Sequence, residues 1–231
     1  METSRAGFID FMCASGVLLF GDFTTKSGRK TPYFIDTGRY TTGSQMRTLG
    51  RAYASTIAER FGDGYDVLFG PAYKGIPLVV ATASALAEIH GRDVPILFDR
   101  KEAKDHGEGG SLVGHRLQDG ERVLIVEDVT TAGTSIRHSV PLLRAAANVE
   151  VVGLVVSVDR MERGPHGDTS ALEAVGEEFG LRAEPIVTLD DILAHLAPGG
   201  GAPSELGPDD VARIEAYRKR YGAVRTAPGS D

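Results

Sequence analysis

Cysteine is nearly absent from this chain, because its 231 residues include only Cys13. A single cysteine forms no internal disulfide framework and no cysteine-rich zinc site. Long apolar runs are absent too. No stretch approaches the ~20 apolar residues of a membrane-spanning helix, and the N-terminus lacks the apolar core of a signal peptide. The sequence therefore predicts a soluble, cytoplasmic protein that has no membrane partner.

Positive charge is in deficit. The chain carries 25 Lys and Arg residues against 32 Asp and Glu residues, which gives a formal net charge of −7. An acidic surface has no electrostatic attraction for a polyphosphate backbone or for anionic lipids. We therefore expect no nucleic-acid partner.

Several common catalytic arrangements are also missing. Cys13 has no evident activating partner, and nothing resembles a Ser-His-Asp triad. Segment 70–75 lacks the Lys-Ser/Thr ending of a Walker loop, so hydrolysis of nucleoside triphosphates is not indicated. Five histidines show no metal-ligand spacing and are interpreted as surface or structural residues: His90, His115, His138, His166 and His195.

What the chain does contain is an alternation of short apolar runs and helical patterns. Alternation of this kind favours βαβ units, with a mostly parallel sheet and helices on both faces. A short helix and a hairpin precede it, within residues 5–36. Strands are predicted at 67–69, 94–98, 123–126, 149–158 and 185–189, and helices at 46–61, 76–89, 133–147, 172–179 and 208–221. A polar stretch at 99–121 and a flexible break at 199–203 interrupt the pattern, and residues 1–231 are expected to form a single domain.

The most informative segment is 123–135. Four aliphatic residues, typical of a buried parallel strand, run directly into Glu127 and Asp128. The carboxyl ends of such strands are where open α/β sheets bind ligands. The following residues, Thr130 to Thr134, can offer backbone N–H groups and hydroxyls to an anion at the start of a helix. Acceptors for sugar hydroxyls beside donors for a phosphate favour a phosphorylated sugar as ligand.

Segment 70–75 ends the first parallel strand and opens the next helix. It is either an ordinary strand-to-helix turn or a second anion-binding loop, in which backbone N–H groups and Lys74 meet a phosphate. The turn is the simpler explanation for the segment alone. A second anion loop two strands further on favours the anion-binding interpretation.

Segment 100–110 is basic, glycine-containing and free of large apolar residues. A solvated surface loop is the simple explanation. However, a long polar connection inside a compact domain is usually either functional or disordered. Cations on a mobile lid could close over a polyanionic leaving group and expel water.

Two smaller basic features have similar alternatives. The turn at 26–30 is either surface decoration or part of a site. Arg160 follows a predicted strand, where it forms a surface ion pair or holds a substrate carboxylate through two parallel hydrogen bonds.

Together these features resemble the type I phosphoribosyltransferases, and specifically the orotate phosphoribosyltransferases. The segments that carry the likeness are 23–34, 70–77, 100–110, 123–135 and 159–164, within a similarity covering most of residues 8–196. Glu127 stands where many relatives have an aspartate, and Thr130 replaces a commonly aliphatic residue. The resemblance implies the type I fold: α/β, with a mostly parallel central sheet flanked by helices, a small N-terminal hood over 1–40 and a flexible catalytic loop. Residues 199–231 would add a break, a C-terminal helix and a tail.

The resemblance also implies an activity. Members of the family transfer ribose 5-phosphate from 5-phosphoribosyl 1-diphosphate to N1 of orotate, with Mg²⁺ as cofactor and as a step in pyrimidine synthesis. The magnesium would be held mainly by substrate, with Glu127 and Asp128 as candidate ligands. The donor-binding residues would be Lys26, Tyr73, Lys74, Arg100, Lys101, Lys104, His106, Glu127, Asp128, Val129, Thr130, Thr131, Ala132, Gly133, Thr134 and Ser135.

For orotate, the resemblance implies backbone contacts at Phe34 and Ile35, a contact from Thr131, and Arg160 on the carboxylate. The catalytic residues would be Lys26, Lys104, His106 and Asp128. The family's lid loop reaches into the neighbouring subunit, which implies a homodimer with shared active sites. Two rival hypotheses stay open: a phosphoribosyltransferase for another base, and a catalytically silent homologue that senses ligands.

Overall fold

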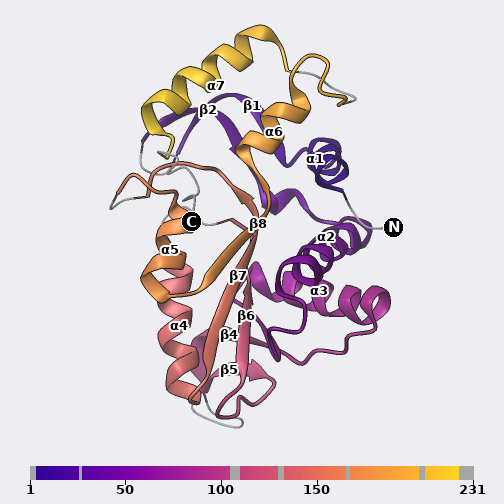
Figure 1. Cartoon of the computed structure of the whole chain (residues 1–231), viewed down its shortest axis with the longest axis vertical. Coiled ribbons are helices and arrows are strands. Elements are labelled where there is room, and N and C mark those ends of the chain that lie inside the picture. The colour runs from indigo at the N-terminus through magenta and orange to yellow at the C-terminus, as the bar shows by residue number, and fades with distance from the viewer. Residues whose placement is uncertain are drawn as a thin grey trace, which may run out of the picture.

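The computed structural model describes residues 4–25, 28–104, 110–129, 133–164, 167–202 and 206–223, without the side chains of 101–104 and 110. In this part of the chain a six-stranded sheet lies between two layers of helices, and a smaller lobe lies at the top of the view (Figure 1). The predicted α/β architecture is confirmed.

The sheet determines where a ligand can bind. Its strands follow the order β5–β4–β3–β6–β7–β8, and all are parallel except β5, which runs antiparallel to β4. The chain leaves β3 toward one edge and returns to β6 on the other side, so the direction of winding changes between these two strands. Such a switch point opens a crevice at the carboxyl ends. The bounds are β3 (Val67–Gly70), β4 (Ile96–Lys104), β5 (Gly110–Gly114), β6 (Arg122–Val126), β7 (Glu150–Asp159) and β8 (Arg182–Thr188).

Alternating residues of the central strands fill two cores. Leu68 and Leu124 face one core, and their neighbours Phe69 and Ile125 face the other, as the two-residue period of a strand requires. One core contains residues of α2 (Gly43–Phe61) and α3 (Gly75–His90), and the other contains residues of α4 (Thr134–Ala146) and α5 (Ala171–Phe179). Because both faces are covered, these strands are aliphatic throughout.

The smaller lobe, called the hood below, brings together segments from both ends of the chain (Figure 1). It consists of α1 (Arg5–Ala14), β1 (Leu18–Thr24), β2 (Lys30–Ile35), the short 3-10 helix η1 (Thr37–Arg39), α6 (Leu189–Leu196) and α7 (Pro208–Tyr221). His195 Nε2 of α6 lies 2.8 Å from Asp10 Oδ1 of α1. The rings of Tyr33 in β2 and Tyr217 in α7 meet edge to face with centroids 5.9 Å apart. The C-terminal helix is therefore packed onto the N-terminal hairpin.

Two sequence-based predictions of secondary structure are wrong. Residues 99–121 are not a continuous polar connection, because β4 continues to Lys104 and β5 pairs against it at the edge of the sheet. Residues 99–110 are mostly polar, so no apolar alternation indicated the hairpin. The structure also adds α6, which begins with a capping box between Thr188 and Asp191. Among the described residues, no helix is long and apolar enough to cross a bilayer.

Candidate functional site

Glu127 and Asp128 follow β6 directly, at the switch point of the sheet. Hydrogen bonds from two neighbouring elements, α2 and β7, hold their backbone. The Tyr53 hydroxyl of α2 donates to the Glu127 carbonyl at 2.6 Å, and the N–H of Glu127 donates to the Val155 carbonyl at 3.0 Å. Ser157 donates to the Asp128 carbonyl from both its N–H (2.9 Å) and its hydroxyl (2.6 Å). The two carboxylates therefore stand on a rigid support.

The Glu127 side chain is almost enclosed, since only 6% of the residue is exposed. Its Oε1 accepts the N–H of Asp128 at 2.9 Å, and the Ser135 hydroxyl at the start of α4 also hydrogen-bonds to it. Burial first, and then the adjacent negative charge of Asp128, raise the pKa of Glu127 to about 7. Glu127 can thus change protonation state near neutral pH.

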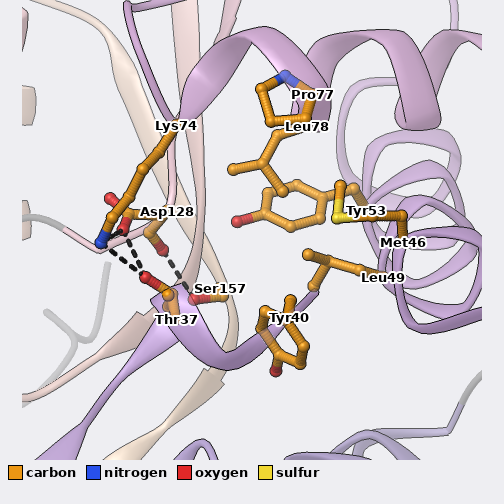
Figure 2. Close-up of a pocket in the computed structure, with 11 residues that line it drawn as sticks. Thr37, Tyr40, Met46, Leu49, Tyr53, Lys74, Pro77, Leu78, Asp128 and Ser157 are labelled. Atoms are coloured by element: carbon orange, nitrogen blue, oxygen red, sulfur yellow. Dashed lines mark hydrogen bonds and ion pairs between the residues drawn. The ribbon is translucent and has the colours of Figure 1, made fainter. Parts of the chain in front are cut away.

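Asp128 is held in the ionised form. Its Oδ2 accepts hydrogen bonds from the Thr37 hydroxyl at 2.7 Å and from Lys74 Nζ at 2.8 Å (Figure 2). Lys74 Nζ also donates to the Thr37 hydroxyl at 2.8 Å, which closes a triangle of three side chains. Burial raises the pKa of Asp128, but the hydrogen bonds from Lys74 and Thr37 outweigh it, so the pKa lies below its usual value. The adjacent carboxyl groups therefore have opposite shifts.

The loop at 70–75 aims Lys74 at this pair. Gly70 and Gly75 pack so tightly that a Cβ on Gly70 would lie 2.2 Å from the Gly75 carbonyl oxygen, so only glycine fits there. The N–H of Ala72 donates to Oδ1 of the buried Asp99 at 2.5 Å. This tight loop presents Lys74 and the exposed Tyr73 at the carboxyl end of β3. The anion-loop interpretation gains support from this geometry.

The start of α4 is the second segment for which anion binding is predicted. Its N-cap, Gly133, has φ of +68°, and a Cβ there would lie 2.4 Å from Val175 Cγ2. Thr134 and Ser135 form the first turn, where N–H groups and the positive end of the helix dipole favour an anion. Val129 continues the chain from Asp128 toward this turn. Thr130, Thr131 and Ala132, predicted for the same loop, lie outside the described residues.

A cavity of about 150 Å³ opens beside the Lys74–Asp128 pair, between η1, α2 and α3 (Figure 2). Its polar wall consists of Thr37, Lys74, Asp128 and Ser157. Its apolar wall consists of Tyr40, Met46, Leu49, Tyr53, Pro77 and Leu78. The carboxylate end of the site therefore borders both solvent-accessible space and the apolar core.

Arg160, predicted to hold a substrate carboxylate, follows β7, which neighbours β6 in the sheet. Its Nη2 donates to Glu162 Oε1 at 2.6 Å, and its guanidinium lies over the Tyr33 ring, 5.2 Å from the centroid. The side chain is only 11% exposed. Phe34 and Ile35 follow Tyr33 at the end of β2, and the Phe34 ring stacks against the Phe23 ring. Arg160 is not among the residues that line the cavity at Asp128.

The predicted lid residues are only partly described. Arg100 is half-buried in β4, and Lys101 and Lys104 continue that strand, their side chains lying outside the description. Lys26 and His106 also lie outside the described residues. The structure therefore brings together Lys74, Glu127 and Asp128 from the predicted donor-binding set, together with the start of α4.

Sequence reasoning missed Thr37, Ser157 and Glu162. Thr37 lies 91 residues before Asp128 and gave no signal beyond its position shortly after Phe34 and Ile35. The sequence indicates Ser157 only as part of an aliphatic strand. Among the described residues, no group of three or more His, Cys, Asp or Glu side chains could hold a metal ion. The described residues of the site thus offer the carboxylate pair as candidate metal ligands.

Comparison with known proteins identifies this arrangement. The family model for the phosphoribosyl transferase domain matches residues 36–180. The orotate phosphoribosyltransferase of Clostridium beijerinckii is 54% identical over 224 residues, covering 96% of this chain and 100% of that protein. A crystal structure of the Francisella tularensis orotate phosphoribosyltransferase superposes with a TM-score of 0.80 at 37% identity, covering 94% of this chain and 99% of that one. The Mycobacterium tuberculosis enzyme in complex with 5-phospho-α-D-ribosyl 1-diphosphate gives 0.59 at 27% identity, covering 81% and 98%. The chain belongs to the orotate phosphoribosyltransferase family.

Proposed function

We propose that this protein transfers ribose 5-phosphate from 5-phosphoribosyl 1-diphosphate to N1 of orotate, in pyrimidine synthesis. The products are orotidine 5′-phosphate and diphosphate. The observation that carries the proposal is the Lys74–Asp128–Glu127 group at the switch point of a phosphoribosyltransferase sheet, in a chain about half identical to orotate phosphoribosyltransferases. A cytoplasmic location is also proposed, in line with the unpaired Cys13, because free thiols are typical of reducing compartments.

The charges of the site suit this reaction. Breaking the C1–O bond ahead of forming the C1–N bond builds positive charge on the ribose ring and negative charge on diphosphate. Asp128, held ionised by Lys74 and Thr37, favours the cationic ring, and a deprotonated Glu127 adds to this effect. The N-terminal turn of α4, beginning at Thr134, faces the 5′-phosphate. No covalent intermediate with the protein is required.

Phosphoribosyltransferases generally use Mg²⁺ with their phosphoribosyl donor. The candidate protein ligands of the ion are two carboxylates, Glu127 and Asp128. Two such ligands fit an ion that is held mainly by substrate. When bound, magnesium would neutralise charge on the departing diphosphate. We propose Mg²⁺ as the cofactor of this chain.

The basic lid has a separate role in the proposal. In this proposal Lys101, Lys104 and His106, which follow Arg100 in the sequence, offset the developing charge of the diphosphate. Replacing Lys104 with alanine is expected to lower kcat by about a hundredfold, with little change in orotate affinity. Single-turnover kinetics, with orotate binding measured separately, would show this division. Unchanged turnover in Lys104→Ala would remove the lid from the mechanism.

We also propose a homodimer with shared active sites. One face of α3, extended by Tyr73 two residues before the helix, supports this. Its residues are all exposed and uncharged, spaced alternately by four and three residues: Tyr73, Pro77, Val80, Ser84 and Ala87. Tyr73 and Val80 are the large apolar side chains that stand exposed in the described residues. An apolar stripe of this kind fits a second helix. It begins beside Lys74, so an interface here would place the partner next to the site.

Hybrid dimers test the sharing directly. Lys104→Ala and Asp128→Asn subunits, each expected to keep about 1% of the activity or less as homodimers, are mixed and allowed to exchange. A hybrid contains one site with both residues intact, so part of the activity should return. If mass spectrometry confirms hybrids and no activity returns, each subunit works alone.

The activity itself is tested by following the ultraviolet absorbance of orotate with purified protein, Mg²⁺ and the phosphoribosyl donor. Orotate loss that needs both other components, with release of diphosphate, is the expected result. A parallel panel of purine and pyrimidine bases addresses the rival substrate. Turnover of another base but not orotate would move the substrate assignment, and silence on every base despite donor binding would favour a sensor.

A further inference from the structure

Glu162 lies at the centre of a buried cluster where the hood meets the carboxyl end of β7. It is 9% exposed. Its Oε1 accepts hydrogen bonds from Arg160 Nη2 at 2.6 Å and from the Tyr33 hydroxyl at 2.7 Å. Its Oε2 pairs with Nη2 of Arg29, which comes from the hairpin turn. One carboxylate thus joins the segment after β7 to the turn and the second strand of the hairpin.

The charges of this cluster do not balance. Arg29 and Arg160 carry two positive charges, and Glu162 supplies one negative charge. Tyr33 adds no charge, because burial first, and then the negative charge of Glu162, raise the pKa of its hydroxyl. Within the described part of the chain, the Nε atoms of Arg29 and Arg160 are both buried without a hydrogen-bond partner. Buried donors of this kind are costly unless an acceptor completes them, so the cluster is short of one anionic acceptor.

The C-terminal helix packs against the same cluster. The Arg29 guanidinium lies over the Tyr221 ring at 4.9 Å and the Tyr217 ring at 5.7 Å from the centroids. These cation–π contacts hold the Arg29 side chain between β2 and α7.

Backbone hydrogen bonds tie the end of α7 to the segment that carries Glu162. The N–H of Arg163 donates to the Tyr221 carbonyl at 2.9 Å, and the N–H of Ala223 donates to the Met161 carbonyl at 2.8 Å. The chain after β7 therefore forms a short antiparallel pairing with the end of α7, with Glu162 opposite Gly222. The end of α7 thus constrains the segment that directly follows Arg160.

We propose that Glu162 is a positioning residue for the acceptor's carboxylate. Together with Arg29 and the end of α7, it fixes the Arg160 guanidinium so that the remaining N–H donors of Arg160 meet the carboxylate of orotate. That carboxylate supplies the acceptor that the cluster lacks. Glu162 does not itself touch substrate. This inference rests on the function proposed above, because it assigns Arg160 to orotate.

The opposite role has a different signature. If Glu162 were only a stand-in for the substrate carboxylate, it would compete with orotate, and removing its charge would tighten binding. If the cluster only stabilised the hood, removing the charge would weaken every nucleotide ligand equally. The positioning role affects only ligands that carry the carboxylate.

Glu162→Gln tests the inference, because glutamine keeps the size but turns an NH₂ group toward one guanidinium. Calorimetry on the full-length protein compares orotidine 5′-phosphate with uridine 5′-phosphate, the same nucleotide without the carboxylate. We expect orotidine 5′-phosphate to bind about tenfold more weakly, and uridine 5′-phosphate to bind as it does to wild type. The KM for orotate should rise by a similar factor with a smaller change in kcat. Equal weakening of both nucleotides, or tighter binding of orotidine 5′-phosphate, would overturn the proposal.

Two further variants keep the test decisive. Tyr33→Phe removes one donor to Glu162 without changing charge, so it should produce a smaller loss confined to orotidine 5′-phosphate, and it carries the test if Glu162→Gln does not fold. Asp66→Asn is the matched control, since it removes a carboxylate paired with Arg122 at the opposite end of the sheet and should leave both affinities unchanged.

The wild-type protein separates this inference from the proposed function. Failure to turn over orotate refutes the function, and the nucleotide comparison reads the cluster without turnover. A wild type that binds the two nucleotides equally would refute the positioning role even if the reaction takes place.

Discussion

The two ends of the proposed site have opposite charge balances. At the end of β6, two adjacent carboxyl groups, Glu127 and Asp128, are accompanied by one ammonium group, that of Lys74, which pairs with Asp128. At the end of β7, Arg29 and Arg160 share one carboxylate, from Glu162. The first group has an excess of negative charge when Glu127 is ionised, and the second has an excess of positive charge.

Neighbouring parallel strands can thus hold the two halves of one reaction. A negative group favours a ribose ring that becomes cationic, and a positive group favours an acceptor that carries a carboxylate. The two groups also differ in how they are supported. Asp128 is tied to Thr37 and Lys74, whereas Glu162 depends on residues from both ends of the chain.

Asp128→Asn should produce the largest effect, because it removes the charge that defines the negative end. Asparagine can still accept a hydrogen bond from Thr37, but it does not stabilise a cationic ring. We expect kcat to fall by about 10²–10³-fold, the scale of one preorganised group in a transition state. Single-turnover kinetics at saturating substrates measures this step. A loss confined to KM would mean that Asp128 binds substrate without acting on the transition state.

The pH dependence of catalysis should show the contribution of Glu127 to the negative end. Because its pKa is raised to about 7, the negative end gains its second charge only as the pH rises through neutrality. We expect log kcat/KM to rise on an acid limb near pH 7, since this parameter reports ionisations of the free enzyme and free substrate. In Glu127→Gln the protein's part of this limb should disappear, leaving only the ionisation of the substrate phosphate. An identical profile in wild type and variant would show that Glu127 does not titrate in this range.

The same pKa shift affects the stability of the unliganded protein. A carboxyl group whose pKa is raised from 4.5 to about 7 on folding favours the fold most when it is protonated, below pH 4.5. This stabilisation declines as the pH rises and is lost above pH 7, where both states are ionised. Glu127→Gln should flatten that decline in urea melts between pH 5 and 8.

Much of the negative end follows from the sequence, and less of the positive end does. Aliphatic runs predicted the central strands, and the carboxylates after β6 and the lysine before α3 were placed at the carboxyl ends of strands. Such local patterns carry that information because both the strand and the polar group lie within a few residues. Thr37 could not be found in this way, since only the packing of the hood on the sheet brings it to Asp128.

The cluster around Glu162 depends on longer contacts. The sequence shows Arg160 after a strand, but Arg29 lies 133 residues before Glu162, and Tyr221 lies at the end of α7. Periodicity predicted α7 as a helix without indicating what it contacts. The edge hairpin of β4 and β5 escaped prediction because residues 99–110 are mostly polar and show no strand-like apolar alternation.

Thr37→Val asks whether the hood contributes to the negative end. Valine keeps the shape but removes the hydroxyl that bonds to both Asp128 and Lys74. The Lys74–Asp128 ion pair stays, so we expect kcat/KM to fall only about three- to tenfold, the scale of an ordinary side-chain hydrogen bond. Thr37→Ser should restore the wild-type value. A loss as large as that of Asp128→Asn would mean that the hydroxyl itself acts on substrate.

Asp66→Asn should have the smallest effect, and it tests whether only charges at the carboxyl ends matter. Hydrogen bonds from the Arg122 side chain and backbone lower the pKa of Asp66 to about 2, so its stabilisation is present above pH 3.8 and is lost as the pH falls through 2. Because the pair is 39% exposed on both sides, solvent screens it. We expect the Tm at pH 7 to fall by about 2 °C and steady-state kinetics to be unchanged. Arg122 starts β6, and Asp128 follows the other end of this strand. A change in kcat would therefore show that removing a charge at the amino end of the strand affects the site at its carboxyl end. Charges along the whole sheet, and not only those at the carboxyl ends, would then matter for the reaction.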